Sequence, residues 1–202
     1  MGIPSAPQLV LASASPRRRE LLAAAGHSFE VLPSTVEEIQ LPGEAPETFA
    51  RRVALEKACD VASRRPGACV LAADTVVVVD GCLFGKPAGR DDARHMLQML
   101  SGRAHRVLTA VALVDAAATV DEVLIESVVE FRSLAIAELE AYLDSAEPYD
   151  KAGAYAVQGE AKKFVKAVRG SYSNVIGLPM EAVTDLLRRH LPASRRTARS
   201  RD

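Results

Sequence analysis

The chain has 202 residues, 49% of them hydrophobic, and is therefore long enough to bury one sizeable core. Its formal net charge of −1 gives no overall field that would attract nucleic acid or an anionic membrane, so we expect neither as a partner. No apolar run approaches the roughly 20 residues that a membrane span requires.

Cysteine usage and the first residues indicate a cytoplasmic protein. The 3 cysteines are widely spaced and odd in number, which is typical of reduced thiols rather than of disulfides or a zinc site. We expect Cys59 and Cys69 to lie in the core. Residues 1–8, MGIPSAPQ, lack the basic and apolar regions of a secretory signal.

The stretch VLASASPRRRELL, residues 10–22, predicts a short apolar strand that enters a helix through a turn. Ser15 is suited to cap that helix, and Pro16 to occupy its first position. The arginines at 17–19 place three cations at the positive end of the helix dipole, which is unfavourable unless an anion binds there. The pattern indicates a phosphate site, and the alternative is an ordinary capped helix with a solvated basic turn.

The rest of the chain shows alternating strand and helix patterns. Strands are predicted over residues 29–32, 69–80, 105–114, 120–131 and 164–168. Helices are predicted over 46–62, from a cap at Asp91 to Gly102, over 136–143 and over 180–191, with a loop at 170–179 before the last of them.

Asp74 is the strongest functional candidate. The segment CVLAADTVVVVD at 69–80 is nearly continuously apolar, as in a central strand that is covered on both faces. An ionised carboxylate there is costly unless it is paired, hydrogen-bonded or bound to a metal. A structural aspartate bonded to nearby backbone is the alternative. Lys86, between Gly85 and Pro87, can return to a position beside Asp74.

Other polar residues carry weaker signals. Lys57 lies on a predicted helix, where a lysine is usually on the surface, and Glu37 and Glu38 lie in a loop, where acidic residues are usually solvated. His105 on a strand is interpreted as a hydrogen-bonded packing residue. The irregular segment PYDKAGAYAVQG, residues 148–159, is typical of a ligand loop.

Five motifs occur in one order along the chain: S-x-S-P-R-R, A-A-D-T-V-V-V, G-K-P, D-K-A-G-A-Y-x-x-Q-G and N-V-x-G-L-P. Together they make the chain resemble the Maf family of nucleoside triphosphate pyrophosphatases, over about residues 9–191. The resemblance implies an α/β fold of the Maf and ITPase-like kind. We expect a single two-lobed domain over 1–191, with a mixed β-sheet and flanking helices around a deep cleft, and a disordered basic tail at 192–202.

The resemblance also implies hydrolysis of a nucleoside triphosphate to the monophosphate and pyrophosphate, with a divalent metal, Mg²⁺ or Mn²⁺. Asp74 matches the family's proton acceptor. Glu38 and Asp74 are the expected metal ligands, and whether Asp74 takes the proton, holds the metal or does both stays open. The polar cleft residues of the family are matched by Ser13, Arg17, Arg18, Glu38, Lys57 and Lys86.

Three positions resemble the dTTP/UTP branch of the family, namely Arg17, Thr75 and Gln158. The branch that acts on 7-methyl-GTP looks different there, with Trp, Gln and Glu. The amide of Gln158 offers a donor and an acceptor that match the edge of thymine or uracil. We therefore expect dTTP and UTP as substrates, and we expect Thr75 and Gln158 to meet the base at one end of the cleft, away from Arg18.

Two other functions are compatible with the sequence. A non-catalytic nucleotide-binding regulator of cell division would need the phosphate cradle but not Asp74. A pyrophosphatase acting on 7-methyl-GTP or another modified nucleotide would use the same chemistry. The expected partner is the nucleoside triphosphate, and a homodimer is left open.

Overall fold

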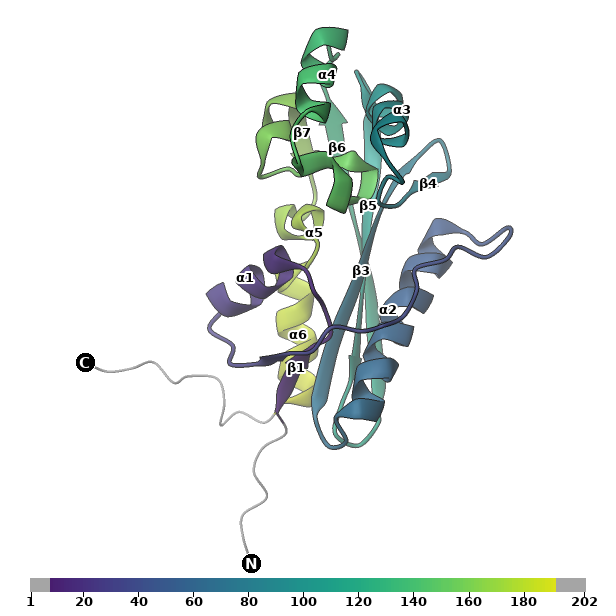
Figure 1. The fold of residues 1–202 in the computed structure, drawn as a ribbon. Helices are drawn as coiled ribbons and strands as arrows, with labels where there is room; N and C mark the ends of the chain where they lie inside the picture. The colour runs from purple at the N-terminus through teal and green to yellow at the C-terminus, as the bar shows by residue number, and fades with distance from the viewer. Residues whose placement is uncertain (1–7, 192–202) are drawn as a thin grey trace, which may run out of the picture.

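The computed structural model describes residues 8–191 (Figure 1). Its centre is a seven-stranded mixed sheet in the order β2-β1-β3-β5-β6-β7, with β4 beside β3. Parallel pairs join β1 to β2 and to β3, and the remaining pairs are antiparallel. The strands are β1 (Leu9–Leu11), β2 (Glu30–Val31), β3 (Cys69–Val79), β4 (Cys82–Phe84), β5 (Ala104–Val114), β6 (Val120–Phe131) and β7 (Val165–Arg169).

Helices flank both faces of this sheet, which confirms the predicted α/β class. In Figure 1, α2 lies along one face of the long strands β3 and β5, while α1 and α6 lie on the other. Helices α3 and α4 lie together at the end of the sheet that is at the top of the figure. The helices are α1 (Pro16–Ala24), α2 (Pro46–Arg64), α3 (Arg90–Leu100), α4 (Ile136–Leu143), α5 (Tyr172–Ile176) and α6 (Met180–His190). Short 3₁₀ turns form η1 (Glu147–Asp150), η2 (Ala152–Ala154) and η3 (Glu160–Phe164).

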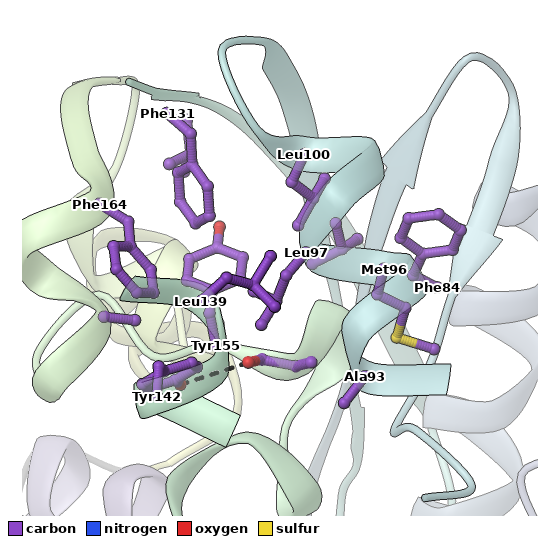
Figure 2. Close-up of a cluster of buried hydrophobic side chains, with 14 of the residues drawn as sticks. Phe84, Ala93, Met96, Leu97, Leu100, Phe131, Leu139, Tyr142, Tyr155 and Phe164 are labelled. Carbon is purple, nitrogen blue, oxygen red and sulfur yellow. Dashed lines mark hydrogen bonds between the residues drawn. The ribbon is translucent and has the colours of Figure 1, made fainter. Parts of the chain in front are cut away.

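Three hydrophobic clusters form the core. One fills the space between α2 and the sheet, and a second lies between the opposite face and helices α1 and α6. The third lies at the end of the sheet beside α3 and α4, where Figure 2 shows Leu97, Phe131, Tyr142 and Phe164 packed together. The Tyr142 hydroxyl there donates to the Ala154 carbonyl at 3.2 Å, so this buried polar group is satisfied.

Side chains of β3 alternate between the two faces of the sheet. Val70 and Ala72 pack in the cluster under α2, whereas Leu71 and Ala73 pack in the cluster under α6. The same alternation places Asp74 on the α2 face and Thr75 on the opposite face.

One edge of β3 is uncovered in its middle. β1 pairs with β3 up to Leu71, and β4 pairs with it from Val77 onward. Between these two residues no strand of the described chain lies along that edge. This gap in the sheet positions the site.

Several sequence predictions differ from the structure at element ends. Helix α3 begins at Arg90 with Gly89 at its N-cap, so Asp91 lies inside the first turn and does not cap it. The predicted loop at 170–179 contains α5, because the Ser171 side chain caps a short helix by accepting from the Asn174 N–H. Cys69 is buried as predicted, but Cys59 is exposed, since it points away from the buried stripe of α2.

The predicted basic tail at 192–202 lies outside the described residues, and so do residues 1–7 of the N-terminal segment MGIPSAPQ. From residue 8 to residue 191, each helix is too short or too polar to cross a membrane.

Candidate active site

A pocket of about 880 Å³ opens at the uncovered edge of β3. Its walls come from the turn before α1, the loop that follows β2, helix α2, strand β3, the turn after β4, the segment around η1 and η2, and the end of α5. The structure thus brings together every residue that the sequence singled out for the site: Ser13, Arg17, Arg18, Glu38, Lys57, Asp74, Thr75, Lys86 and Gln158.

A buried lysine joins two acidic residues of the pocket, Asp74 and Glu38. Lys57 Nζ donates to Asp74 Oδ1 and to Glu38 Oε1, at 2.7 Å in each case. Lys57 is only 7% exposed, so the usual surface position of a helical lysine does not apply here. Lys86 adds a second cation, with its Nζ 3.7 Å from Glu38 Oε2.

The sequence does contain a signal for the burial of Lys57. Buried residues of α2 recur at steps of four, at Phe49, Val53 and Val61, and Lys57 falls in that series. A lysine on the apolar stripe of a helix must find an anion, and Asp74 on the facing side of β3 supplies it.

Asp74 keeps one oxygen free. The residue is 3% exposed, and its Oδ2 atom is buried with no hydrogen-bond partner in the described part of the chain. A buried, unpaired carboxylate oxygen is an unused acceptor, and it belongs to a residue that lines the pocket.

The cations of the pocket keep Glu38 ionised. Burial raises the pKa of this carboxyl, but Lys57, Lys86 and Arg18 lower it by more, so its pKa lies below the ordinary value. Glu38 therefore carries a negative charge at neutral pH.

Arg18 is held by three segments of the chain. Its Nε donates to the Gly177 carbonyl at 2.8 Å, its Nη1 to Ser13 Oγ at 3.4 Å and its Nη2 to Thr75 Oγ1 at 3.0 Å. Burial lowers the pKa of the guanidinium, while Asp74 and Glu38 oppose that shift. The turn before α1 is ordered as predicted, with the Ser15 side chain capping the helix.

The predicted position of Thr75 away from Arg18 is wrong. Thr75 follows Asp74 directly, so its side chain points to the other face of β3, where α1 and α5 meet the sheet. Gln158, by contrast, is exposed at the pocket on the segment after η2.

The predicted ligand loop supplies further pocket residues that the sequence did not single out. Tyr149 and Lys151 line the pocket, and Arg17 Nη1 lies 3.9 Å from Asp150 Oδ2. The Gly153 N–H donates to the Gly85 carbonyl at 3.0 Å, which ties this segment to the turn that carries Lys86. The composition of the segment indicated a loop for a ligand but not which side chains face it.

His105 lies outside the pocket and has the packing role that its position on a strand predicted. Its Nε2 atom lies 2.7 Å from the Tyr155 hydroxyl, and burial lowers its pKa to about 4. The imidazole is therefore neutral at physiological pH.

The family described as "Maf-like protein" matches residues 8–190. The chain belongs to the Maf family. It is 51% identical over 187 residues to the "dTTP/UTP pyrophosphatase" of Anaeromyxobacter dehalogenans (strain 2CP-1 / ATCC BAA-258), covering 91% of this chain and 94% of that protein. It is 52% identical over 182 residues to the "dTTP/UTP pyrophosphatase" of Methylococcus capsulatus (strain ATCC 33009 / NCIMB 11132 / Bath), covering 90% of each.

Among solved structures, the Ham1 protein of Staphylococcus aureus resembles this Maf-family chain with a TM-score of 0.54 at 12% identity, covering 90% of this chain and 98% of that one. At this identity the likeness concerns the fold alone, and it agrees with the ITPase-like architecture that the sequence predicted.

The charge pattern of the Maf-family site suits a polyanion. Arg17, Arg18, Lys57 and Lys86 surround the pocket, while Glu38 and Asp74 are the acidic groups that Lys57 holds on one side. The site therefore combines cations that can neutralise phosphate charge with a carboxylate that can accept a proton.

Proposed function

We propose that this chain hydrolyses nucleoside triphosphates, with dTTP and UTP as substrates, to the nucleoside monophosphate and pyrophosphate. Relatives that are about half identical carry the name dTTP/UTP pyrophosphatase. The structural observation that carries the proposal is the state of Asp74, whose Oδ1 is held by Lys57 while Oδ2 has no hydrogen-bond partner among the described residues.

In the reaction, Asp74 Oδ2 accepts a proton from the attacking water. The water oxygen forms a new bond to the α phosphorus. The phosphoanhydride bond between the α and β phosphates breaks, and pyrophosphate leaves. Lys57 holds the carboxylate in place through Oδ1, so that the acceptor atom is fixed before the water arrives. Arg17, Arg18 and Lys86 balance the negative charge that builds up on the phosphates.

The acidic residues fit a divalent cation, Mg²⁺ or Mn²⁺. Glu38 is ionised and partly exposed, and Asp74, which is joined to it through Lys57, is the second carboxylate of the pair. Within the described residues there is no group of three His, Cys, Asp or Glu side chains that could hold a metal by itself. Phosphate and water oxygens would complete the ligand set, which is the arrangement that Mg²⁺ favours. When bound, the cation neutralises and polarises the phosphates.

Base selection is assigned to Gln158. Gln158 reaches the pocket from a segment distinct from those that carry Arg17, Arg18, Lys57 and Lys86, and an amide can both donate to and accept from a pyrimidine edge. Thr75 contributes through Arg18, with which it is hydrogen-bonded, rather than from the opposite end of the pocket.

A nucleotide panel tests the proposal. The purified chain is incubated with dTTP, UTP, 7-methyl-GTP and dGTP, with Mg²⁺ or Mn²⁺, and pyrophosphate release is measured. The proposal expects the fastest release from dTTP and UTP. Binding without release from any nucleotide would favour the non-catalytic regulator, and the fastest release from 7-methyl-GTP would favour the other branch.

Cellular location and assembly complete the proposal. A cytoplasmic enzyme is consistent with nucleotide substrates and with Cys59, Cys69 and Cys82 being free thiols. The sequence left open whether the chain forms a homodimer, and sedimentation velocity on the same preparation measures its oligomeric state.

A further inference from the structure

A row of hydrogen bonds crosses the sheet from α1 to α5. Arg18 Nη2 donates to Thr75 Oγ1 at 3.0 Å, the two threonine oxygens Thr75 Oγ1 and Thr109 Oγ1 lie 2.9 Å apart, and Thr109 Oγ1 donates to the Asn174 carbonyl at 3.1 Å. The two hydroxyls meet because Thr75 on β3 is directly opposite Thr109 on β5 in the antiparallel register.

The two ends of the row fix the direction of every hydrogen bond in it. A guanidinium only donates, a carbonyl only accepts, and each hydroxyl has a single hydrogen. Thr109 gives its hydrogen to the Asn174 carbonyl, so Thr75 donates to Thr109 and presents its oxygen to Arg18 as an acceptor. The other acceptor near Thr75, the Gly177 carbonyl, lies at 3.5 Å, the limit for a hydrogen bond.

The far end of the row is rigidly held. Asn174 is fully buried, and its Nδ2 donates to the Val107 carbonyl on β5 and to Ser127 Oγ on β6, at 3.0 Å in each case. Gly177, three residues later, accepts from Arg18 Nε. Two of the three hydrogen bonds of Arg18 therefore depend, directly or through the threonines, on α5 and the residue after it.

Thr109 itself cannot touch a bound nucleotide, because it is fully buried and does not line the pocket. We propose that Thr109 is a positioning residue: by accepting the Thr75 hydrogen, it turns the Thr75 oxygen toward Arg18 and holds the guanidinium in the orientation that binds the triphosphate. The proposal rests on the proposed function only for the identity of the ligand.

Two substitutions separate the hydroxyl from the shape of the side chain. Thr109→Val keeps the shape and removes the hydroxyl, and Thr109→Ser keeps the hydroxyl. Titration calorimetry with dTTP is done in the Asp74→Asn background, so that the nucleotide persists. We expect Thr109→Val to weaken binding about 10-fold and Thr109→Ser to stay within about 2-fold of the parent. In the active enzyme the loss should fall on KM more than on kcat. Equal binding by both variants and the parent would overturn the proposal.

A double-mutant cycle tests whether the effect passes through Arg18. With Arg18→Ala already present, Thr109→Val should cause no further loss of dTTP affinity, because the group that it positions is gone. If the two losses in binding free energy add in full, Thr109 supports the fold in general and does not position Arg18.

A third measurement is independent of hydrolysis. Exchange of the Arg18 Nη2–H protons with water, followed by NMR, should be faster in Thr109→Val than in the wild type and unchanged in Thr109→Ser, because Nη2 is the nitrogen that donates to Thr75 Oγ1. If Thr109→Val does not fold, Thr75→Val breaks the same row and should give the same faster exchange. Faster exchange in an enzyme that hydrolyses no nucleotide would reject the proposed function alone. Unchanged exchange in an enzyme that hydrolyses dTTP would reject the positioning role alone.

Discussion

Lys57 and Asp74 form an ion pair that is shielded from water. Lys57 Nζ lies 2.7 Å from Asp74 Oδ1, and the two side chains are 9% and 5% exposed. The pair explains how a central apolar strand tolerates a carboxylate, and it leaves Oδ2 as the one oxygen of Asp74 without a hydrogen bond in the described structure.

Removal of the lysine should destabilise the fold. Lys57→Met leaves the Asp74 carboxylate buried and unpaired, which we expect to lower the free energy of unfolding by about 3 kcal/mol or more. The matched control is Lys86→Met, since the Lys86 side chain is 58% exposed and should cost less than about 0.5 kcal/mol. Urea unfolding measures both. Equal losses in the two variants would show that the Lys57–Asp74 pair does not support the fold.

Substitution of Arg18 should affect both stability and binding. Arg18→Ala removes hydrogen bonds to Gly177, Ser13 and Thr75, so we expect a stability loss of about 1–3 kcal/mol together with weaker triphosphate binding. Arg19→Ala is the control, because Arg19 is exposed on the same helix and does not line the pocket. Thermal unfolding and dTTP calorimetry on both variants check this, and the expectation fails if Arg18→Ala binds dTTP as tightly as Arg19→Ala does.

Base choice should change at Gln158. Gln158→Glu replaces an amide donor with a group that only accepts, so hydrolysis of dTTP and UTP should fall by about 10- to 100-fold. The quantity to compare is the ratio of kcat/KM for UTP to that for 7-methyl-GTP in the variant and in the wild type. A ratio that does not move toward 7-methyl-GTP means that Gln158 does not read the base.

Stability should depend on pH through His190. Hydrogen bonds to Asp121 and Asp115 raise the pKa of this imidazole above its ordinary value. The stabilisation is therefore complete below the unfolded pKa of about 6.5 and is lost as the pH rises through the folded pKa. The free energy of unfolding of the wild type should exceed that of His190→Asn by a larger margin at about pH 5.5 than at about pH 8.5. A difference that is independent of pH would contradict this assignment.

The sequence predicted every strand except β4, most helices and the key carboxylate for clear physical reasons. Asp74 stands out because a charge inside an apolar strand is costly. Glu38 does not, since acidic residues in a loop are usually solvated, and only the family resemblance indicated it. Lys57 could have been found from its place in the apolar series of α2, although a helical lysine is usually on the surface. Thr75 was placed at the wrong end of the pocket because the step from one strand residue to the next reverses the face.

Other features could not be read from one sequence. Thr109 looks like an ordinary strand residue, and its contact with Thr75 depends on the register between β3 and β5. Helix α5 spans five residues between glycines, which is too short for a periodic signal. Cys59 shows the same limit, because its exposure depends on which side of α2 faces the sheet.

The central claim is that Asp74 Oδ2 takes the proton from water. The most direct measurement is single-turnover release of pyrophosphate from dTTP by Asp74→Asn, with dTTP affinity and Mg²⁺ affinity measured on the same variant. Asparagine keeps the shape and an oxygen ligand but is not a base. The account predicts a rate at least about 10²-fold lower with nucleotide binding largely retained. Pyrophosphate release at close to the wild-type rate would contradict it.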